Sequence, residues 1–147
     1  MNPSVPWHHA SRVTADVGEG FVATEAPAMQ QSIRSALYPG EGKRAPFPIE
    51  VEFSSGAVER VVVEWRNRYV GFVPVSHLAT MRGQLTSAGR ATVWSPGHVY
   101  FDGTYWRVWV GPAPQDGFPE VGEGYDELPE PPAAIFGIPL SRLRRDV

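Results

Sequence analysis

Alternation of apolar and polar residues over the stretch 48–110 constrains the fold of this chain more than any other feature of its 147 residues. The alternation is clearest where glutamates separate the apolar residues Ile49, Val51 and Phe53. Because successive side chains of a β-strand point to opposite faces, a period of two puts the apolar side chains on one face and the carboxylates on the other. The run predicts a half-buried strand over 49–53.

The residues that follow predict two further strands joined by a tight reversal. Residues 58–65 are rich in β-branched side chains, which fit a pleated sheet better than a helix. The next two residues are Arg66-Asn67, and asparagine tolerates the left-handed backbone of a two-residue turn. We therefore expect 69–73 to fold back antiparallel to 58–65. Pro74 ends this strand, because it has no N–H to donate to a neighbouring strand.

A short helix is expected directly after this strand. Ser76 is its expected N-cap, and Gly89 suits the position just beyond its C-terminus. Between them, apolar residues recur at helical spacing: Leu78, Met81 and Leu85. This spacing predicts a helix with one face packed against the sheet.

Two more strands and a hairpin are expected to close the stretch. Residues 90–94 suit a strand, and Ser95-Pro96-Gly97 suits a turn after it. Asp102-Gly103 then stands between two aromatic runs, 98–101 and 104–110, and this dipeptide is typical of a two-residue hairpin turn. Both faces of the last run carry large side chains, so we expect both faces to be covered.

The N-terminal part predicts one strand and one helix before the organising stretch. Residues 13–23 suit a strand with a bend at its glycines. Thr24 is the expected cap of a helix that ends at Tyr38, before Pro39-Gly40. The apolar stripe of that helix consists of Ala26, Met29, Ile33 and Leu37. Residues 38–48 are expected to form an exposed loop.

Length and composition favour a single domain with arms at both ends. A chain of 147 residues that is 42% hydrophobic can bury one core. We expect an irregular N-terminal arm over 1–12, a β-barrel-like domain over 13–112 and a Pro/Gly-rich arm over 113–147. The predicted fold class is mainly β (α+β): a small antiparallel barrel or roll, like the oligonucleotide-binding fold, with one or two short helices and irregular terminal arms.

The C-terminal arm changes in charge along its length. Residues 1–115 hold ten basic and nine acidic side chains, whereas 116–147 hold three basic and seven acidic ones. The acidic part comes first and the arginines come last, and an apolar cluster lies between them: Ile135, Phe136, Ile138 and Leu140. A fully solvated tail has no use for such a cluster, so we interpret it as a docking peptide for a protein partner or for a second copy of the chain.

Several classes of chemistry find no support in the sequence. The chain has no cysteine, so disulfides and thiolate metal sites are excluded. Adjacent His8-His9 have no third ligand at a suitable spacing, and no cofactor motif is present. We expect no metal, no cofactor and no catalytic residues. No run approaches the roughly 18 apolar residues of a membrane span and no secretory leader is evident, so we expect a cytoplasmic protein that does not enter a membrane.

Order and motifs together resemble those of the HIRAN domain. The matching segments lie within 13–110: VGEGF, then YVGFVP before a helix that begins SHL, then RATVW and a closing hairpin. The resemblance implies a barrel of the oligonucleotide-binding type that grips the 3′ end of single-stranded DNA. It also implies that Phe21 stacks on a base, and it places Gly71, Phe72 and Pro74 at the strand-to-helix corner. The family's Asn-Pro-Tyr-Asp-like pocket loop is absent, because its place reads SSGAVER.

The function that the sequence favours is a non-catalytic binding or adaptor module of HIRAN-like form. Its ligand is single-stranded nucleic acid, with single-stranded DNA as the candidate, or a protein partner. The expected binding face consists of Phe21, Arg66, Arg68, Phe72 and Arg82. One alternative is a structural subunit of an ordered assembly such as a virion, whose arms contact neighbours. Another is a small hydrolase or metal enzyme, which needs His77, His98 and Asp102 to lie together.

Overall fold

The alternating run forms the strand around which the sheet is built. The computed structural model describes residues 11–129, 134–135 and 138–139, and in it β3 (Phe47–Ser55) pairs with a strand on each side. Its apolar face is buried, with Val51 0% exposed, whereas Glu50 and Glu52 are exposed on the other face. The predicted half-buried strand is confirmed, because the apolar face of β3 has a core to pack against.

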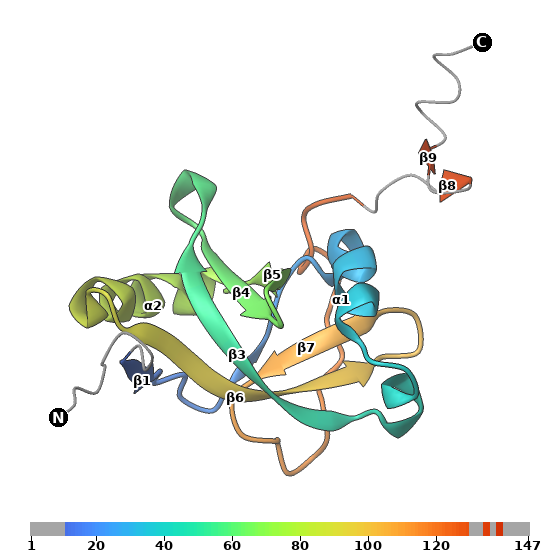
Figure 1. Cartoon of the computed structure of the whole chain (residues 1–147), viewed down its shortest axis with the longest axis horizontal. Helices are drawn as coiled ribbons and strands as arrows, with labels where there is room; N and C mark the ends of the chain where they lie inside the picture. The colour runs from blue at the N-terminus through green and yellow to red at the C-terminus, as the bar shows by residue number, and fades with distance from the viewer. Residues whose placement is uncertain (1–10, 130–133, 136–137, 140–147) are drawn as a thin grey trace, which may run out of the picture.

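Seven strands form one curled sheet in the order β2-β7-β6-β3-β4-β5, with β1 beside β6 (Figure 1). The other strands are β1 (Arg12–Thr14), β2 (Phe21–Val22), β4 (Val61–Trp65), β5 (Arg68–Phe72), β6 (Thr92–Phe101) and β7 (Trp106–Val110). The pairing of β1 with β6 is parallel, and the other pairings in this sheet are antiparallel. Backbone hydrogen bonds between Thr24 and Phe72, of 2.8 and 3.2 Å, link the two ends of the sheet.

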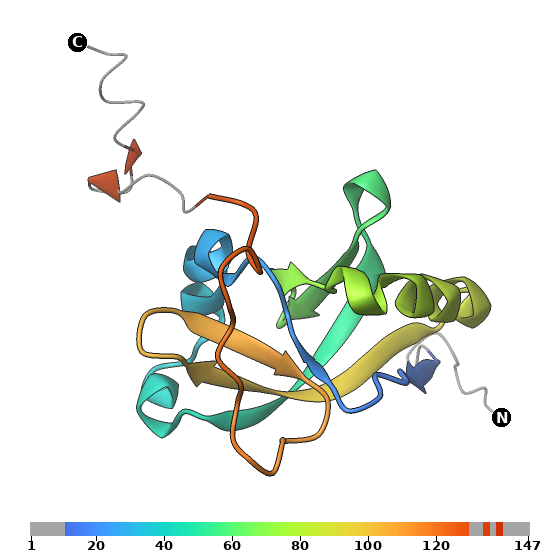
Figure 2. The same cartoon turned by 180° about the vertical axis from the view of Figure 1, so that it is seen from behind.

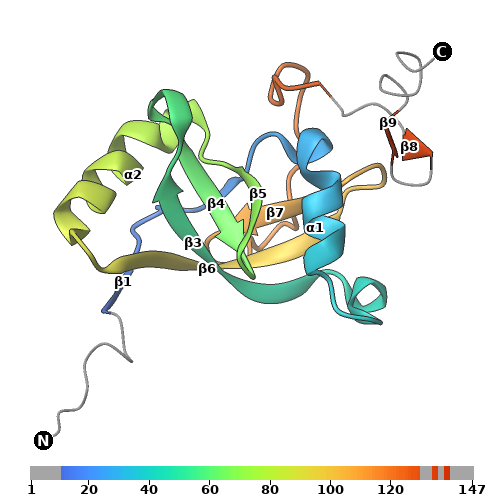
Figure 3. The same ribbon diagram turned by 45° about the horizontal axis from the view of Figure 1, so that its top comes forward.

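Two short α-helices lie beside the curled sheet: α1 (Gln30–Ala36) next to β5 and α2 (Val75–Ala88) across the other end (Figure 3). Within residues 11–129, three 3₁₀ turns join the elements: η2 (Ala26–Met29), η3 (Glu41–Arg44) and η4 (Ala57–Glu59). A mainly β, half-barrel sheet with two short α-helices confirms the predicted fold class. Gly89 lies just past the end of α2, as expected.

Both predicted helix caps are wrong. The helix α2 begins at Val75, one residue before the predicted cap Ser76, and the Ser76 hydroxyl instead bonds with the His77 ring at 3.0 Å. The first predicted helix begins as the 3₁₀ turn η2, and its cap position is occupied by Glu25 in a left-handed conformation, with φ 71°. Pro74 and Pro27 explain both shifts, because a proline suits the start of a helix where no N–H is needed.

Two of the predicted turns and one strand start also need correction. No turn interrupts β6 at Ser95-Pro96-Gly97, because Gly97 serves a different purpose: a Cβ there would lie 2.4 Å from the Trp109 carbonyl oxygen of β7. The strand expected from Val58 begins only at Val61, since Val58 and Glu59 take left-handed angles in η4. The predicted exposed loop 38–48 contains η3, and β3 already begins within it.

The two hairpin turns differ in outcome. At Arg66-Asn67 the φ angles are 51° and 63°, so the two-residue reversal between β4 and β5 is confirmed. At Asp102-Gly103 the pairing stops at Phe101 and Trp106, which leaves a four-residue connection and not the expected two. The Asp102 carboxylate accounts for the longer loop, because it accepts N–H bonds from Thr104 and Tyr105 at 2.8 and 2.7 Å.

The segment 112–129 crosses the outer face of β6 and β7 (Figure 2). The side chains of Phe118, Val121 and Tyr125 pack there against a second buried cluster, which consists of Val22, Tyr100 and Trp109. Backbone contacts hold this segment as far as Leu128, so the packed part of the chain extends beyond the predicted domain boundary at residue 112.

Most of the predicted N-terminal arm and the last part of the predicted C-terminal arm lie beyond the described residues. Of the N-terminal arm, residues 1–10 are outside the described part. In the C-terminal arm, Ile135 lies in β8 (Ala134–Ile135) and Ile138 in β9 (Ile138–Pro139), which pair antiparallel with each other. Phe136 and Leu140, the other members of the predicted docking peptide, fall outside the described residues.

Candidate ligand-binding pocket

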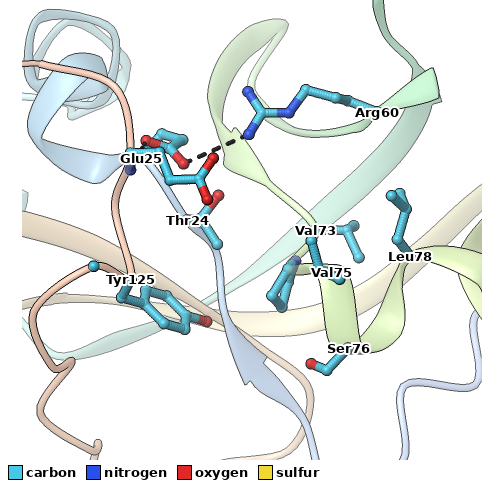
Figure 4. Close-up of a pocket in the computed structure, with 11 residues that line it drawn as sticks. Thr24, Glu25, Arg60, Val73, Val75, Ser76, Leu78 and Tyr125 are labelled. Carbon is cyan, nitrogen blue, oxygen red and sulfur yellow. Dashed lines mark hydrogen bonds and ion pairs between the residues drawn. The ribbon is translucent and has the colours of Figure 1, made fainter. Parts of the chain in front are cut away.

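A pocket of about 280 Å³ opens where four separate parts of the chain meet (Figure 4). One wall is the corner between β5 and α2, residues 73–78, and the opposite wall is the C-terminal segment at 124–127. Thr24 and Glu25, which follow β2, form the back of the pocket, and Arg60 reaches over it from the residue before β4. The corner that carries the resemblance described above is therefore one wall of a cavity.

Glu25 fixes the C-terminal wall of the pocket. Its side chain is 1% exposed, and its carboxylate accepts N–H bonds from Glu127 and Leu128 at 2.8 and 2.7 Å. Its own N–H donates to the Asp126 carboxylate at 2.7 Å. The left-handed backbone of Glu25 is a strained conformation for a residue with a side chain, and these contacts hold it in place.

Arg60 is the cation of the pocket. Its guanidinium lies 4.3 Å from the centre of the Phe72 ring, and one of its nitrogens lies 3.6 Å from the Glu25 carboxylate. The Arg60 side chain is 33% exposed, so part of its hydrogen-bonding capacity faces solvent. The carboxylate of Glu127 also borders the pocket and is exposed. The pocket thus offers a ligand one cation and one exposed carboxylate, and Glu25 adds a buried negative charge beside Arg60.

The rest of the wall is apolar or backbone. Val73 and Leu78 contribute apolar surface, and Val75 and Ser76 begin α2, where the first N–H groups of a helix have no partner within the helix. Tyr125 completes the wall and donates its hydroxyl to the Val22 carbonyl. Burial raises the pKa of Tyr125 to about 12, so the hydroxyl keeps its proton at neutral pH. A ligand meets apolar contacts inside the pocket and polar groups at its rim.

A buried arginine anchors the C-terminal wall to the sheet. Arg107 on β7 is 3% exposed, and its guanidinium contacts Asp102 at 2.6 Å and Asp126 at 3.0 Å. A buried guanidinium between two carboxylates is stable as a set, but each member depends strongly on the others. The pocket wall therefore cannot move away without breaking the contact between Arg107 and Asp126.

The structure does not bring the five predicted binding residues to one face. Phe72 lies beside the pocket, under Arg60. Arg82 on α2 pairs with Glu59 at 2.8 Å, and both residues lie at the end of the β4–β5 hairpin away from its turn, as Phe72 does. Arg66 and Arg68 lie at the turn, at the opposite end of that hairpin. Phe21 is only 5% exposed and packs against the His77 ring, with the ring centres 4.6 Å apart.

Arg66 has a structural partner of its own. Its guanidinium bonds both carboxylate oxygens of Glu41 at 2.6 and 2.8 Å and donates to the Ala36 carbonyl at 2.8 Å. The same group lies 3.7 Å from the Tyr38 ring centre and 4.5 Å from that of Trp65. The hydrogen bonds from Arg66 lower the pKa of Glu41 to about 2. Arg66 therefore joins α1, η3 and the β4–β5 turn.

Sequence reasoning missed the residues that build the pocket. Arg60 ends the SSGAVER loop, and only its place before a strand marks it in the sequence. Glu25 and its partners at 126–128 are about a hundred residues apart, a separation that no local pattern reveals. A signal for the C-terminal wall did exist, since Phe118 and Tyr125 are large aromatic residues in a segment otherwise rich in proline and glycine.

The groups considered for catalysis or metal binding have other neighbours. His77 packs on Phe21, the ring of His98 lies 5.4 Å from that of Phe118, and Asp102 is paired with Arg107. Within the described ranges, no three or more His, Cys, Asp or Glu side chains are grouped so as to hold a metal ion. Among the helices of the described part, none has the length and apolar character needed to cross a bilayer.

Comparison of the chain with protein-family models, with curated proteins and with solved structures finds no match. The resemblance to the HIRAN domain thus stays a prediction from the motifs and the order of elements.

Proposed function

We propose that this protein is a non-catalytic binding module whose pocket between β5, α2 and the C-terminal segment takes one end of a single-stranded nucleic acid. The observation that carries the proposal is Arg60, whose side chain is one third exposed and whose guanidinium is stacked on Phe72 at the rim of a cavity. The motif order that resembles the HIRAN domain supports the same ligand, because its strand-to-helix corner is the wall opposite Glu127.

The chemistry of the pocket suits the terminal nucleotide. Arginine binds phosphate through a planar fork of N–H donors, and stacking on Phe72 holds that fork in position. A terminal sugar hydroxyl is a donor, and the exposed Glu127 carboxylate is an acceptor for it. The apolar surface of Val73 and Leu78 accepts the base or sugar. A cavity of about 280 Å³ holds the end of a strand and not a longer stretch.

The charges of the pocket also limit the affinity for phosphate. Two carboxylates and one guanidinium border the cavity. The single guanidinium attracts one phosphate of the ligand, and the carboxylates repel any further phosphate. Each phosphate contact with a single strand contributes about −0.7 to the slope of log affinity against log salt. We therefore expect a slope between about −0.7 and −1.4, far shallower than for a protein that grips the backbone along its length.

An oligonucleotide titration tests the proposal. Fluorescence anisotropy of a labelled single-stranded oligonucleotide with a free 3′ hydroxyl is expected to report binding by the intact protein. Replacing that hydroxyl by a phosphate is expected to weaken binding about tenfold, because Glu127 and Glu25 then face an anion. Arg60→Ala is expected to weaken binding by about tenfold or more, the usual effect of losing a hydrogen-bonded charge.

Arg90→Ala is the matched control, because Arg90 is an exposed arginine beyond the C-terminus of α2. We expect it to bind as the wild type does. Equal losses for Arg60→Ala and Arg90→Ala, equal binding of both strand ends, or no binding of any oligonucleotide would each contradict the proposed function. Circular dichroism and thermal denaturation of Arg60→Ala check that the variant keeps its fold.

A further inference from the structure

A second aromatic site lies on the outer face of β6 and β7, under the loop 113–121. The Phe118 ring of this loop stacks on Tyr100, with ring centres 4.6 Å apart and planes at 11°. His98 and Trp109 lie beside the same ring, at 5.4 and 6.2 Å. Phe118 thus occupies an aromatic cradle formed by three side chains of the sheet.

Two polar atoms in this cradle are buried without a partner. They are Tyr100 Oη and His98 Nδ1, and among the described residues no other buried side-chain nitrogen or oxygen lacks a hydrogen bond. Tyr100 is 5% exposed, and because Tyr100 and His98 are two residues apart on β6, their side chains share one face. Folded proteins rarely leave such groups unpaired, and the cover that Phe118 gives them is an apolar ring.

The loop that carries Phe118 is weakly held. Across the described part of the chain, no hydrogen bond joins residues 113–121 to the sheet; the bond from Trp109 Nε1 at 2.8 Å ends at Pro112. Phe118 and Val121 hold the loop by apolar contacts, and Gly111, with φ 116°, precedes it. The strong contacts of the C-terminal segment begin only at Tyr125. The loop can therefore move while its anchor stays in place.

A hollow of about 430 Å³ adjoins the cradle. Tyr100 and Phe118 line it on one side, together with Phe101, and the carboxylates of Asp102 and Glu120 border it. It shares no residue with the pocket described above. A ligand that enters this hollow meets the rings of Phe118 and Tyr100.

We propose that this cradle is a second binding site, for a planar heteroaromatic ring of the nucleobase class, which takes the place of Phe118 among the aromatic rings and hydrogen-bonds with Tyr100 Oη and His98 Nδ1. A phenyl ring covers these atoms without satisfying them, whereas a nucleobase has a face for stacking and an edge with donors and acceptors. Burial lowers the pKa of His98, so at neutral pH its imidazole is uncharged and one ring nitrogen remains an acceptor. Exocyclic amino groups of a base have acceptors in Asp102 and Glu120.

Nucleoside binding to the full chain tests the site. Adenosine, cytidine, guanosine and thymidine are titrated by calorimetry, and at least one is expected to bind. Phe118→Ala is expected to tighten this binding about tenfold, because a stacked ring no longer competes. Tyr100→Phe keeps the shape but removes the hydroxyl, and is expected to weaken binding roughly fivefold while raising the melting temperature of the free protein.

Two control variants separate this site from other effects. Tyr38→Ala removes an aromatic ring that is 60% exposed near Arg66, and is expected to leave nucleoside binding unchanged. Arg90→Ala, at an exposed position that borders neither cavity, is likewise expected to leave it unchanged. A single-stranded oligonucleotide that competes with the nucleoside identifies the source as a base within a strand. Lack of competition identifies it as a free nucleoside, and both outcomes support the site.

Three results would overturn the proposal. They are the absence of nucleoside binding to wild type and Phe118→Ala alike, equal affinities of these two proteins, and equal affinities of wild type and Tyr100→Phe. If Phe118→Ala does not fold, thermal denaturation of the wild type and of Tyr100→Phe tests whether the cradle binds a nucleoside. A nucleoside is then expected to raise the melting temperature of the wild type more than that of Tyr100→Phe. The same rise in both proteins, or no rise in the wild type, contradicts the site.

Discussion

At the scale of single residues, the pair of Arg66 and Glu41 has the clearest consequence. The side chain of Glu41 is 9% exposed, and its pKa falls from an ordinary 4.5 to about 2 because it accepts hydrogen bonds from Arg66. A carboxylate whose pKa is lower in the folded state stabilises the fold fully above about pH 4.5. This stabilisation is lost as the pH falls from 4.5 towards 2.

Glu41→Gln is therefore expected to lower the free energy of unfolding by about 2 kcal/mol at pH 7, and to flatten its fall below pH 4.5. Urea denaturation between pH 7 and pH 2.5 measures both effects. Glu59→Gln is the control, because Glu59 pairs with Arg82 at an exposed site, where an ion pair contributes about 0–1 kcal/mol. If the free energy of unfolding falls equally below pH 4.5 in the wild type and in Glu41→Gln, the pair of Arg66 and Glu41 does not cause the fall.

At the scale of elements, the closure of the sheet depends on a close approach at Gly71. Gly71 in β5 lies against the backbone of the two residues that follow β2. A Cβ at position 71 would lie 2.7 Å from the Ala23 Cβ and 2.8 Å from the Thr24 carbonyl oxygen. Gly71→Ala is expected to cost about 1–3 kcal/mol of unfolding free energy, the usual range for overpacking. Gly83→Ala on α2 meets nothing within 4 Å and is expected to stabilise by about 1 kcal/mol. Denaturant unfolding of both variants measures the contrast, and similar changes in the two would contradict it.

The elements themselves follow largely from local sequence, and the exceptions have local causes. The period of two in β3 and the reversal at Arg66-Asn67 were predictable because each depends on neighbouring residues. The turn at Ser95-Pro96-Gly97 was wrongly predicted, since a glycine that admits an adjacent strand looks the same in sequence as a glycine that turns the chain. The residue type of Val58 predicts a strand, but its left-handed backbone is not compatible with one, and β4 begins only at Val61.

At the scale of the whole molecule, the C-terminal segment belongs to the packed structure. A chain that ends at Gln115 lacks Phe118 and Tyr125 and leaves Arg107 with one carboxylate partner in place of two. Loss of a partner from a buried charge costs about 3–5 kcal/mol. The melting temperature is therefore expected to fall by on the order of 10 °C. Asp116→Asn, at an exposed position of the same segment, is expected to melt as the wild type does. Equal melting of the shortened and full chains would contradict this prediction.

The site could not be predicted in the same measure, because its walls come from segments far apart in the chain. The sequence predicts Phe72 as a binding residue. It does not predict Glu25 and Arg60, because they come together only through the pairing of strands that are distant in the chain. Phe21 and Arg66 were chosen by residue type, which does not tell a buried ring or an ion-paired guanidinium from an exposed one. The unpaired atoms of His98 and Tyr100 depend on where Phe118 lies, and no spacing encodes that position.

The two backbone hydrogen bonds between Thr24 and Phe72 affect whether the sheet can pair with strands of other molecules. Strands at the border of an open sheet recruit strands from other molecules, which is how many β proteins aggregate. Here one such border strand, β5, meets the residue just after β2, and α1 lies along it. Growth of the sheet from one molecule to the next is thus blocked on that side.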